Sequence, residues 1–461
     1  MSNEAHNDII AALATPPGTG ALAIIRLSGA GCRALCAALF SGRAGVDGAK
    51  AARFHGYLCD PAAPDGREVD EVVLHSYIAP HSFTGEEMIE INCHGGMVVV
   101  RRLLELLLQY GARLAEPGEF SRRAFLNGKI DLIQAEAIAD LIAAHSRRDA
   151  DLSLAQLHGG LSAALQRLTA GLRAGCALLE LELDFSEEVE FVERGQLTAL
   201  MQAALAEIDT ILATYNYGRI VREGARVVLV GKVNVGKSTL LNSLLRRERA
   251  IVSPLPGTTR DTLEEGMELD GLLFRLVDTA GLRAPAESVE QEGIARTLAE
   301  VESADILVQL FEAHTPLDEL DRRVLALGAE KRRVATLRIL TKSDLPSNPA
   351  TAADPDLAGA LQISCYSGRG IAELQQTLHD SVAAWQPAGE GVVLTRLRHF
   401  AALQEVRQHL LLARQSLTEG QFGEFIALDL RAALAAAGTI TGEVSSADLL
   451  NDIFAAFCIG K

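Results

Sequence analysis

Residues 231–238 read Gly-Lys-Val-Asn-Val-Gly-Lys-Ser and fit the pattern G-x-x-x-x-G-K-[ST]. The β-type run Arg226–Val230 precedes this stretch and the helical run Thr239–Arg247 follows it, which is the context that a phosphate-binding loop requires. Its glycines let backbone N–H groups wrap the phosphates, and the helix N-terminus adds a favourable field. We therefore expect Lys237 to reach the outer phosphates and Ser238 to bind magnesium. The alternative is a chance glycine-rich turn.

Two motifs further along the chain suit a magnesium ion and a γ-phosphate. Asp278 follows a strand and begins the run Asp-Thr-Ala-Gly, so it can hold magnesium through water while the Gly281 amide senses the γ-phosphate. Thr259, in the run Gly-Thr-Thr-Arg-Asp at 257–261, is placed to complete the magnesium shell in the triphosphate state.

A fourth motif, Thr-Lys-Ser-Asp at 341–344, ends a strand and suits a guanine base. The Asp344 carboxylate can accept hydrogen bonds from both the ring N–H and the exocyclic amine of guanine, which adenine cannot supply together. Ser364 and Cys365 follow the last strand and are expected to support the base through main-chain amides. Thr341 stands where Asn is common, so we expect one weaker base contact. Four such motifs in this order favour a GTPase.

The residue that orients the attacking water is not set by the motifs. Leu282 follows Gly281 in place of the Gln of Ras-like enzymes, and an aliphatic chain cannot position water. Arg260, Arg283 and Glu290 are the local candidates. Asn234 has a side-chain carbonyl that could hold a monovalent cation where an arginine finger would otherwise act, and the alternative is a free loop position.

The spacing of apolar residues along the chain predicts an α/β segment between two helical segments. Ala- and Leu-rich stretches with apolar residues three and four apart run from about 131 to 217 and from 392 to 457, which predicts helices. Between them, strands alternate with helical patterns, which predicts a mostly parallel sheet. The expected strands are Arg226–Val230, Phe274–Val277, Ile306–Leu310, Leu337–Leu340 and Leu361–Ile363, and those of the mixed α/β N-terminal block are Ala21–Leu27, Val72–Ile78 and Met88–Cys93. An α/β domain inserted into a helical domain is the economical interpretation, and domains in series are the alternative.

Composition narrows the class of protein. The chain has 461 residues, of which 48% are apolar, and this composition excludes a mainly disordered chain. Its formal charge of −17 is unsuited to general nucleic-acid binding, so any RNA contact needs a local basic surface or a partner. Seven cysteines without a Cys-x-x-Cys pair argue against a disulfide framework or a zinc ribbon. With no predicted targeting peptide or membrane span, we expect a soluble cytoplasmic protein.

Motifs along the whole chain resemble one family. The residues that carry the resemblance are the four GTPase motifs, Pro-Gly-Glu-Phe-Ser-Arg-Arg-Ala-Phe-Leu-Asn-Gly-Lys at 117–129, Ala-Glu-Ala-Ile-Ala-Asp-Leu-Ile at 135–142 and Cys-Ile-Gly-Lys at 458–461. Together they are similar to the bacterial tRNA-modification GTPases of the MnmE (TrmE) family.

The resemblance implies an architecture and an activity. It implies a tetrahydrofolate-binding, dimerising N-terminal domain at 1–125, a helical domain in segments 126–219 and 386–461, and a P-loop GTPase domain inserted at 220–385. Members of the family act with a flavin-containing partner, MnmG, in a heterotetramer. They add an aminomethyl or carboxymethylaminomethyl group at position 5 of the wobble uridine of certain tRNAs. The methylene comes from a 5-formyl or 5,10-methylene tetrahydrofolate derivative, and potassium activates GTP hydrolysis when two G domains meet.

The resemblance also assigns residues. The GTP contacts fall on Asn234, Val235, Gly236, Lys237, Ser238, Thr239, Ser253, Thr258, Thr259, Asp278, Gly281, Thr341, Lys342, Asp344, Ser364 and Cys365. Magnesium falls on Ser238 and Thr259, and potassium on Asn234, Ser253, Leu255 and Thr258. The water-orienting acid falls on Glu290, the folate contacts on Arg26, Glu90, Lys129 and Lys461, and the family's C-terminal cysteine on Cys458.

Several of these residues have a plain structural alternative. Without the resemblance, Arg26 and Glu90 would be taken as ordinary strand-end charges, and Lys129 as a surface lysine beside a helix. Cys458 is either a small residue packed beside Phe454 and Phe457, or a redox or nucleophilic thiol near the modified base.

Two other functional classes stay open at this point. One is a regulatory GTPase switch, for instance in ribosome assembly, which needs no folate site and no terminal thiol. The other is an ATPase or kinase that uses the same phosphate loop. Folate binding separates the first class from a tRNA-modifying enzyme, and competition between GTP and ATP separates the second.

Overall fold

The computed structural model describes residues 8–42, 46–48, 50–64, 66–184, 194–245, 264–278, 298–330, 335–387 and 391–461. The chain divides into two compact units. The first comprises Met1–Ala139, Gln156–Leu165 and Ala435–Lys461, and the second comprises Asp140–Ala155 and Gln166–Leu434. These units cut across the four predicted segments, whose boundaries stay a prediction.

The first unit contains a seven-stranded sheet. Its strand order is β3 (Phe40–Gly42), β4 (Ala52–Cys59), β5 (Glu68–Tyr77), β6 (Met88–His94), β2 (Leu22–Ser28), β1 (Ile9–Leu13) and β7 (Ala112–Leu114). Neighbouring strands are antiparallel except for β1 and β7, which are parallel. Ile25 and Leu27 alternate with Arg26 along β2, so the aliphatic side chains enter the core while Arg26 faces the other side. The predicted strands at β2, β5 and β6 are confirmed.

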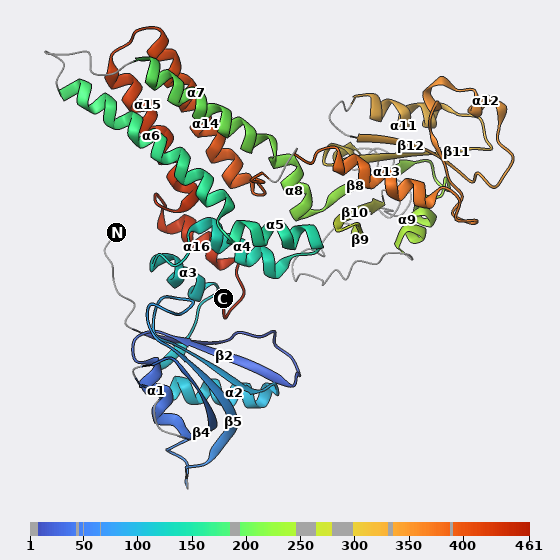
Figure 1. The fold of residues 1–461 in the computed structure, drawn as a ribbon. Helices are drawn as coiled ribbons and strands as arrows, with labels where there is room; N and C mark the ends of the chain where they lie inside the picture. The colour runs from blue at the N-terminus through green and yellow to red at the C-terminus, as the bar shows by residue number, and fades with distance from the viewer. Residues whose placement is uncertain are drawn as a thin grey trace, which may run out of the picture. The chain divides into compact units, whose positions relative to one another are not determined.

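Helices and a C-terminal segment complete this unit. Helices α1 (Cys32–Leu39) and α2 (Met97–Gln109) contribute Cys36 and Leu103 to the core of the sheet, and Figure 1 shows α2 beside the strands. Helices α3 (Glu119–Leu126) and α16 (Ala447–Ala455) contact each other. Gly460 then lies so close to β1 that a Cβ atom there would come within 2.3 Å of the Leu13 carbonyl oxygen. The last residues of the chain are thereby held against the N-terminal sheet.

Helices form much of the second unit, although parts of α4, α5, α6 and α15 belong to the first unit. They are α4 (Leu132–Ala143), α5 (Arg147–Leu157), α6 (Gly160–Asp184), α7 (Arg194–Ala213), α8 (Tyr215–Glu223), α14 (Leu397–Thr418) and α15 (Gly423–Thr441). On α7, Leu197, Met201 and Ile208 are buried at helical spacing, and α7 packs along α14 (Figure 1). The predicted helical pattern is confirmed.

One helical stretch of the described chain, Arg194–Glu223, is long and apolar enough to cross a membrane when only length and composition are considered. A buried helix in the core of a soluble protein passes the same test. Because the apolar side chains Leu197, Met201 and Ile208 are already buried by protein, this stretch is weak evidence against the expectation of no membrane span.

The inserted α/β domain of the second unit is built on a six-stranded sheet. Its order is β13 (Leu361–Gln362), β12 (Ala335–Thr341), β11 (Ile306–Glu312), β8 (Ala225–Gly231), β10 (Leu272–Asp278) and β9 (Glu264–Leu269). All pairs are parallel except β9–β10, which is an antiparallel hairpin. The prediction of a mostly parallel sheet inserted between helical segments is confirmed. The sequence analysis missed β9, because three glutamates and a glycine leave it without an apolar run.

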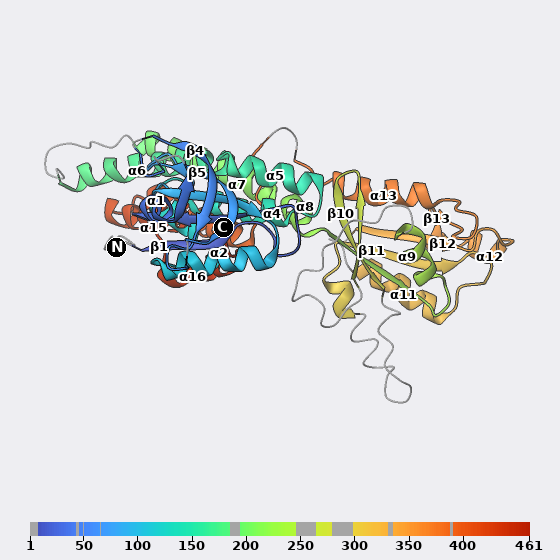
Figure 2. The same ribbon diagram turned by 90° about the horizontal axis from the view of Figure 1, so that it is seen from below.

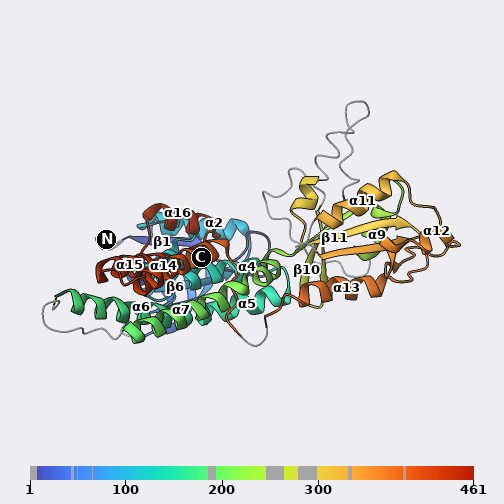
Figure 3. The ribbon, with the colours of Figure 1, turned by 90° about the horizontal axis from the view of Figure 1, so that it is seen from above.

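Helices cover both faces of this sheet. Figures 2 and 3 both show α11 (Glu319–Glu330) and α13 (Ile371–Ala383) on opposite faces. Val227 and Leu229 of β8 pack with α13 and with α9 (Lys237–Leu245), whereas Val228 and Val230 belong to a separate cluster. The short helix α12 (Pro349–Ala352) follows β12. Burial on both faces explains why β8 reads as a continuous aliphatic run.

Candidate functional site

The phosphate loop connects β8 to α9 at the carboxyl edge of the sheet. Lys237 is only 6% exposed, and its Nζ donates hydrogen bonds to the carbonyl oxygens of Gly231 at 2.6 Å and Lys232 at 2.7 Å. The ammonium is thus held by the loop itself. Asn234 has a left-handed backbone with φ of 64° and an exposed side chain, a conformation that Asn tolerates better than most residues. This geometry fits a loop that presents amides and one cation to phosphates.

A pair of oxygen-bearing side chains that suits magnesium lies beside the loop. The Ser238 Oγ donates to Oδ2 of Asp278 at 2.7 Å. The two residues meet because β8 and β10 are adjacent and parallel, so their carboxyl ends share one edge of the sheet. Hydroxyl and carboxylate oxygens are hard ligands of the kind that Mg²⁺ prefers. The donor set therefore fits magnesium bound with a nucleotide.

The residues predicted to recognise the base form the next part of the same edge. Ser364 Oγ donates to Oδ1 of Asp344 at 2.6 Å, and this hydrogen bond is the main cause of the lowered pKa of Asp344. The Ser364 amide donates to the Arg369 carbonyl at 3.0 Å, and the Ser364 hydroxyl supports Asp344. Support of a base by the Ser364 and Cys365 amides stays a prediction. Lys342 has a φ of 57°, and its Nζ donates to Glu312 Oε1 at 2.5 Å.

Thr341 acts differently from the weak base contact that its sequence position suggests. Its side chain is buried, and its hydroxyl lies 2.8 Å from the Val235 carbonyl oxygen and 3.1 Å from that of Phe311. Thr341 therefore ties the end of β12 to the phosphate loop. After the last strand, burial and then the charge of Asp344 raise the pKa of the Cys365 thiol. The next residue, Tyr366, is 94% exposed.

A second cluster of polar residues lies in the first unit. The register of β2 and β6 places Arg26 opposite Glu90, and Arg26 Nη2 donates to Glu90 Oε1 at 2.7 Å. Tyr77 Oη donates to Glu90 Oε2 at 3.2 Å. The Arg26 guanidinium lies over two aromatic rings, 5.2 Å from the centre of Phe83 and 5.8 Å from that of Phe120. We call Arg26, Tyr77, Phe83, Glu90, Phe120 and Lys461 the Arg26 cluster.

The Arg26 cluster has an unfilled hydrogen-bonding position. Among the described residues, Arg26 Nη1 is buried and has no hydrogen-bond partner. Burial and then the charge of Arg26 lower the pKa of Lys461, which places the C-terminal residue beside Arg26. A buried donor without an acceptor is costly, and a bound anion or heteroaromatic acceptor would satisfy it. Cations, one carboxylate and aromatic rings fit the carboxylates and pterin ring of a folate.

Lys129, a predicted folate contact, and Cys458, the predicted thiol, are not part of the Arg26 cluster. Lys129 Nζ donates to the Pro80 carbonyl at 3.0 Å, at the beginning of the loop that carries Phe83. Cys458 is exposed, and its carbonyl accepts from the Gly118 amide at 3.4 Å. Tyr77, Phe83 and Phe120 were missed by the sequence analysis, because strand and loop aromatics carry no motif that marks them as ligand contacts.

Two family descriptions match most of the chain. The family description "MnmE helical domain" matches residues 132–458, and "GTP-binding protein TrmE N-terminus" matches residues 9–129. The chain belongs to the MnmE family. A protein from Moorella thermoacetica, named tRNA modification GTPase MnmE, is 43% identical over 467 aligned positions that cover 99% of this chain and 100% of the relative.

Other MnmE relatives match equally completely. Proteins of the same name from Chlorobaculum tepidum and Thermotoga petrophila are 45% and 40% identical, covering 98% of this chain and 97% and 100% of the relatives. Among solved structures, Era from Aquifex aeolicus is 24% identical and covers 41% of this chain and 67% of its own, with a TM-score of 0.27. A likeness that weak carries no argument about function.

Several residues assigned by the MnmE resemblance lie outside the described residues. They are Ser253, Leu255, Thr258, Thr259, Gly281 and Glu290, together with the alternatives Arg260 and Arg283. Their roles stay predictions. Val235, Gly236 and Thr239 lie within the phosphate loop and the first turn of α9, as the motif predicts.

Lys232 of the phosphate loop makes contacts that the motif does not predict. Lys232 Nζ lies 2.7 Å from Asp318 Oδ2 and 2.6 Å from Asp321 Oδ2, at the N-terminus of α11. Asp318 and Asp321 each accept the other's backbone N–H, which is a capping box. Burial opposes the charge of Lys232, but hydrogen bonds to both carboxylates raise its pKa. The Asp-x-x-Asp pattern at the start of a helix predicts the capping box, but it does not predict the contact of these carboxylates with Lys232.

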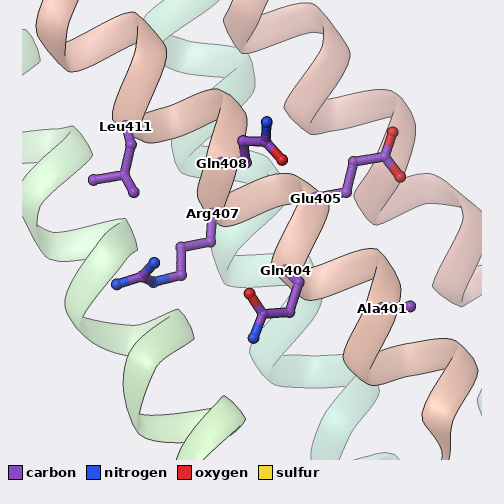
Figure 4. A pocket seen from close by; sticks show the side chains of 6 residues that line it. All are labelled: Ala401, Gln404, Glu405, Arg407, Gln408 and Leu411. Atoms are coloured by element: carbon purple, nitrogen blue, oxygen red, sulfur yellow. The ribbon is translucent and has the colours of Figure 1, made fainter.

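A shallow hollow of about 500 Å³ follows α14 and is unlike either site. Figure 4 shows its six lining residues along this one helix, Ala401, Gln404, Glu405, Arg407, Gln408 and Leu411. Arg407 reaches toward the neighbouring helix, where its Nε donates to Asp209 of α7 at 2.6 Å. With long polar side chains from a single helix, this hollow has no converging set of functional groups.

Proposed function

We propose that this chain is a potassium-activated GTPase that modifies the wobble uridine of tRNA together with a flavin-containing partner. The family shows the coarser activity, and the chain is a tRNA modification GTPase. The observation that carries the proposal is the meeting of Lys237, Ser238, Asp278 and Asp344 at one edge of the inserted sheet, in a chain that matches the MnmE family from end to end.

For GTP hydrolysis, each group has a separate task. Lys237 neutralises charge on the outer phosphates, and Ser238 with Thr259 would hold magnesium while Asp278 supports it through water. Asn234 with Ser253, Leu255 and Thr258 would hold potassium, which supplies positive charge at the leaving oxygen. Glu290 is proposed to steer the attacking water. Asp344 selects guanine because a carboxylate accepts from two neighbouring N–H groups.

For the one-carbon transfer, the Arg26 cluster is proposed to bind a tetrahydrofolate derivative. Glu90 would accept from the pterin amine and ring N–H, while Arg26 and Lys461 would meet acceptor atoms or carboxylates. Lys129 is proposed to contribute from the rim, and Cys458 is proposed as a thiol near the modified base. Bound folate supplies the methylene carbon that the modification needs.

The assembly follows from the same proposal. A homodimer formed through the N-terminal domain would bind the flavin-containing partner MnmG as a heterotetramer in the cytoplasm. With a formal charge of −17, this chain is expected to meet tRNA through the complex. The domain segments 1–125, 126–219, 220–385 and 386–461 are proposed as the units of this assembly.

The proposal is tested by two measurements on the full chain. Phosphate release from GTP should be faster in KCl than in NaCl at equal ionic strength, and Asn234→Ala should remove that difference. Nucleoside analysis of tRNA from a strain without its own family member should show the modified wobble uridine only when this chain is supplied. Absence of GTP hydrolysis in KCl, or no change in the nucleosides, would overturn the proposal.

A further inference from the structure

Asp140 joins three helical elements of the second unit. It lies near the end of α4 and is largely buried. Arg396 binds it with two nitrogens, Nε to Oδ2 at 3.1 Å and Nη2 to Oδ1 at 2.8 Å, and Arg222 Nε donates to Oδ1 at 3.1 Å. One carboxylate is therefore shared by two guanidinium groups that are far apart in sequence.

The two arginines mark the two places where the chain crosses between the helical part and the inserted α/β domain. Arg222 is in α8, which leads directly into β8, and Arg396 immediately precedes α14, shortly after the chain returns from α13. Asp140 thus holds both the entering and the returning segment. A bidentate arginine–carboxylate pair fixes geometry as well as supplying energy.

The two crossing segments also contact each other directly. The Leu394 amide donates to Thr214 Oγ1 at 2.9 Å. A Cβ atom on Gly218 would lie 2.3 Å from the Leu394 carbonyl oxygen, so the segments approach as closely as a glycine permits. We call Asp140, Thr214, Gly218, Arg222, Leu394 and Arg396 the collar.

Beside the collar, the helical part contacts the sheet that carries the nucleotide site. The Arg148 amide donates at 3.2 Å to the carbonyl of Gly271, in the turn between β9 and β10, and Arg148 Nη1 donates to Tyr217 Oη at 3.2 Å. Strand β10 ends at Asp278, the carboxylate bound to Ser238. A shift of this strand on nucleotide binding would therefore act on the N-terminus of α5 and on α8.

Helix α4 has a second role at its other end. Leu132 and Ala135 pack in one cluster with Phe454 and Phe457, immediately before Cys458. The helix that carries Asp140 therefore also supports the segment that leads to Cys458 and Lys461.

We propose that Asp140 is a positioning residue that couples GTP hydrolysis to tRNA modification, by fixing both crossings of the inserted domain to α4. This inference rests on the proposed function and adds to it the residue that links the two chemistries. Without the carboxylate, the inserted domain is expected to stay folded, because buried apolar side chains of its own sheet and helices form its core. Its movements then no longer reach α4, because the two guanidinium groups have lost their common anchor.

The test compares Asp140→Asn with the wild-type chain in two assays. GTP hydrolysis in KCl should stay within about twofold, while the modified fraction of wobble uridine should fall at least about fivefold, as loss of an allosteric coupling would give. Hydrogen exchange of residues 132–143 should respond to a non-hydrolysable GTP analogue in the wild type and not in Asp140→Asn. Asp140→Glu, which keeps the charge, should recover part of the modification.

Asp209→Asn is the matched control. It removes a carboxylate that binds one arginine, Arg407, between α7 and α14. It should leave both assays and the exchange response unchanged. If Asp140→Asn does not fold, Thr214→Val tests the same collar through the hydrogen bond to Leu394 and should lower modification alone.

Two results would overturn the inference. One is a parallel loss of hydrolysis and modification in a folded Asp140→Asn, and the other is wild-type modification in it. Failure of the proposed function is distinguishable from both, because the wild-type chain itself would then give no modified uridine.

Discussion

The nucleotide site and the Arg26 cluster are built in opposite ways. In the nucleotide site, Lys237 and Ser238 are neighbours in one loop, and the remaining groups enter at the ends of parallel strands. In the Arg26 cluster, Arg26, Glu90 and Lys461 come from two strands and the last residue of the chain. The centre of the first site is one short loop of consecutive residues, whereas the second site forms only where segments distant in sequence meet.

This difference has a chemical reason. Phosphates can be held by consecutive backbone amides, so a short contiguous motif is enough for recognition. A pterin ring and its carboxylates need side chains of several kinds around a flat group, and no short stretch of chain can surround such a group. The two sites should therefore respond independently to substitution.

The largest expected effect is in the contiguous site. Lys237→Ala should slow GTP hydrolysis by at least about a hundredfold, because a cation aimed at the developing phosphate charge is lost. Phosphate release under saturating GTP measures this. Folate binding should be unchanged, and Arg101→Ala on the exposed face of α2 serves as the control for charge removal. Wild-type turnover in Lys237→Ala would show that the loop does not bind the phosphates as proposed.

The base end of the same site can be altered without loss of chemistry. Asp344→Asn should shift preference from guanosine to xanthosine triphosphate by about ten- to a hundredfold, since the amide donates where the carboxylate accepted. Competition binding with both nucleotides measures the ratio. Ser364→Ala should weaken guanine binding less, because it removes only the hydroxyl that orients Asp344. An unchanged ratio in Asp344→Asn would remove Asp344 from base recognition.

The dispersed cluster should show a smaller and separate effect. Arg26→Ala should weaken 5-formyltetrahydrofolate binding by at least about tenfold, the equivalent of losing one charge-assisted hydrogen bond. Titration calorimetry measures the affinity, and GTP hydrolysis should stay within about twofold of wild type. If hydrolysis fell together with folate binding, the independence of the two sites would be disproved.

The smallest effect concerns stability beside the collar. Burial is the first cause that raises the pKa of Asp149 to about 6, and the charge of Asp140 adds to it. The folded state therefore favours the protonated form, so the contribution of this carboxyl to stability is lost as the pH rises from about 4 to about 6. Asp149→Asn should stabilise the second unit by about 1–2 kcal/mol near neutral pH, and by much less below about pH 4.5.

Thermal unfolding of both chains across this pH range measures the difference. The control is Asp151→Asn, on the exposed side of α5. An advantage of Asp149→Asn that grows toward low pH would contradict the assigned direction of the pKa shift.

The sequence by itself determined much of the inserted domain. Aliphatic runs at β8, β10 and β12, each followed by a motif residue, predicted parallel strands whose ends form one site, because the sheet places successive carboxyl ends at one edge. The helical spacing of Leu197, Met201 and Ile208 likewise predicted buried helices. These features depend on short-range periodicity, which one sequence shows directly.

Only the tertiary structure decided which distant residues meet. The aromatic rings around Arg26, the hydroxyl of Thr341 against the phosphate loop, and the shared carboxylate of Asp140 join residues that no periodicity relates. Side-chain contacts across elements depend on register, crossing and burial, and each of these is a property of the packed chain. The motifs therefore identified the chemistry, while packing set the partners that position it.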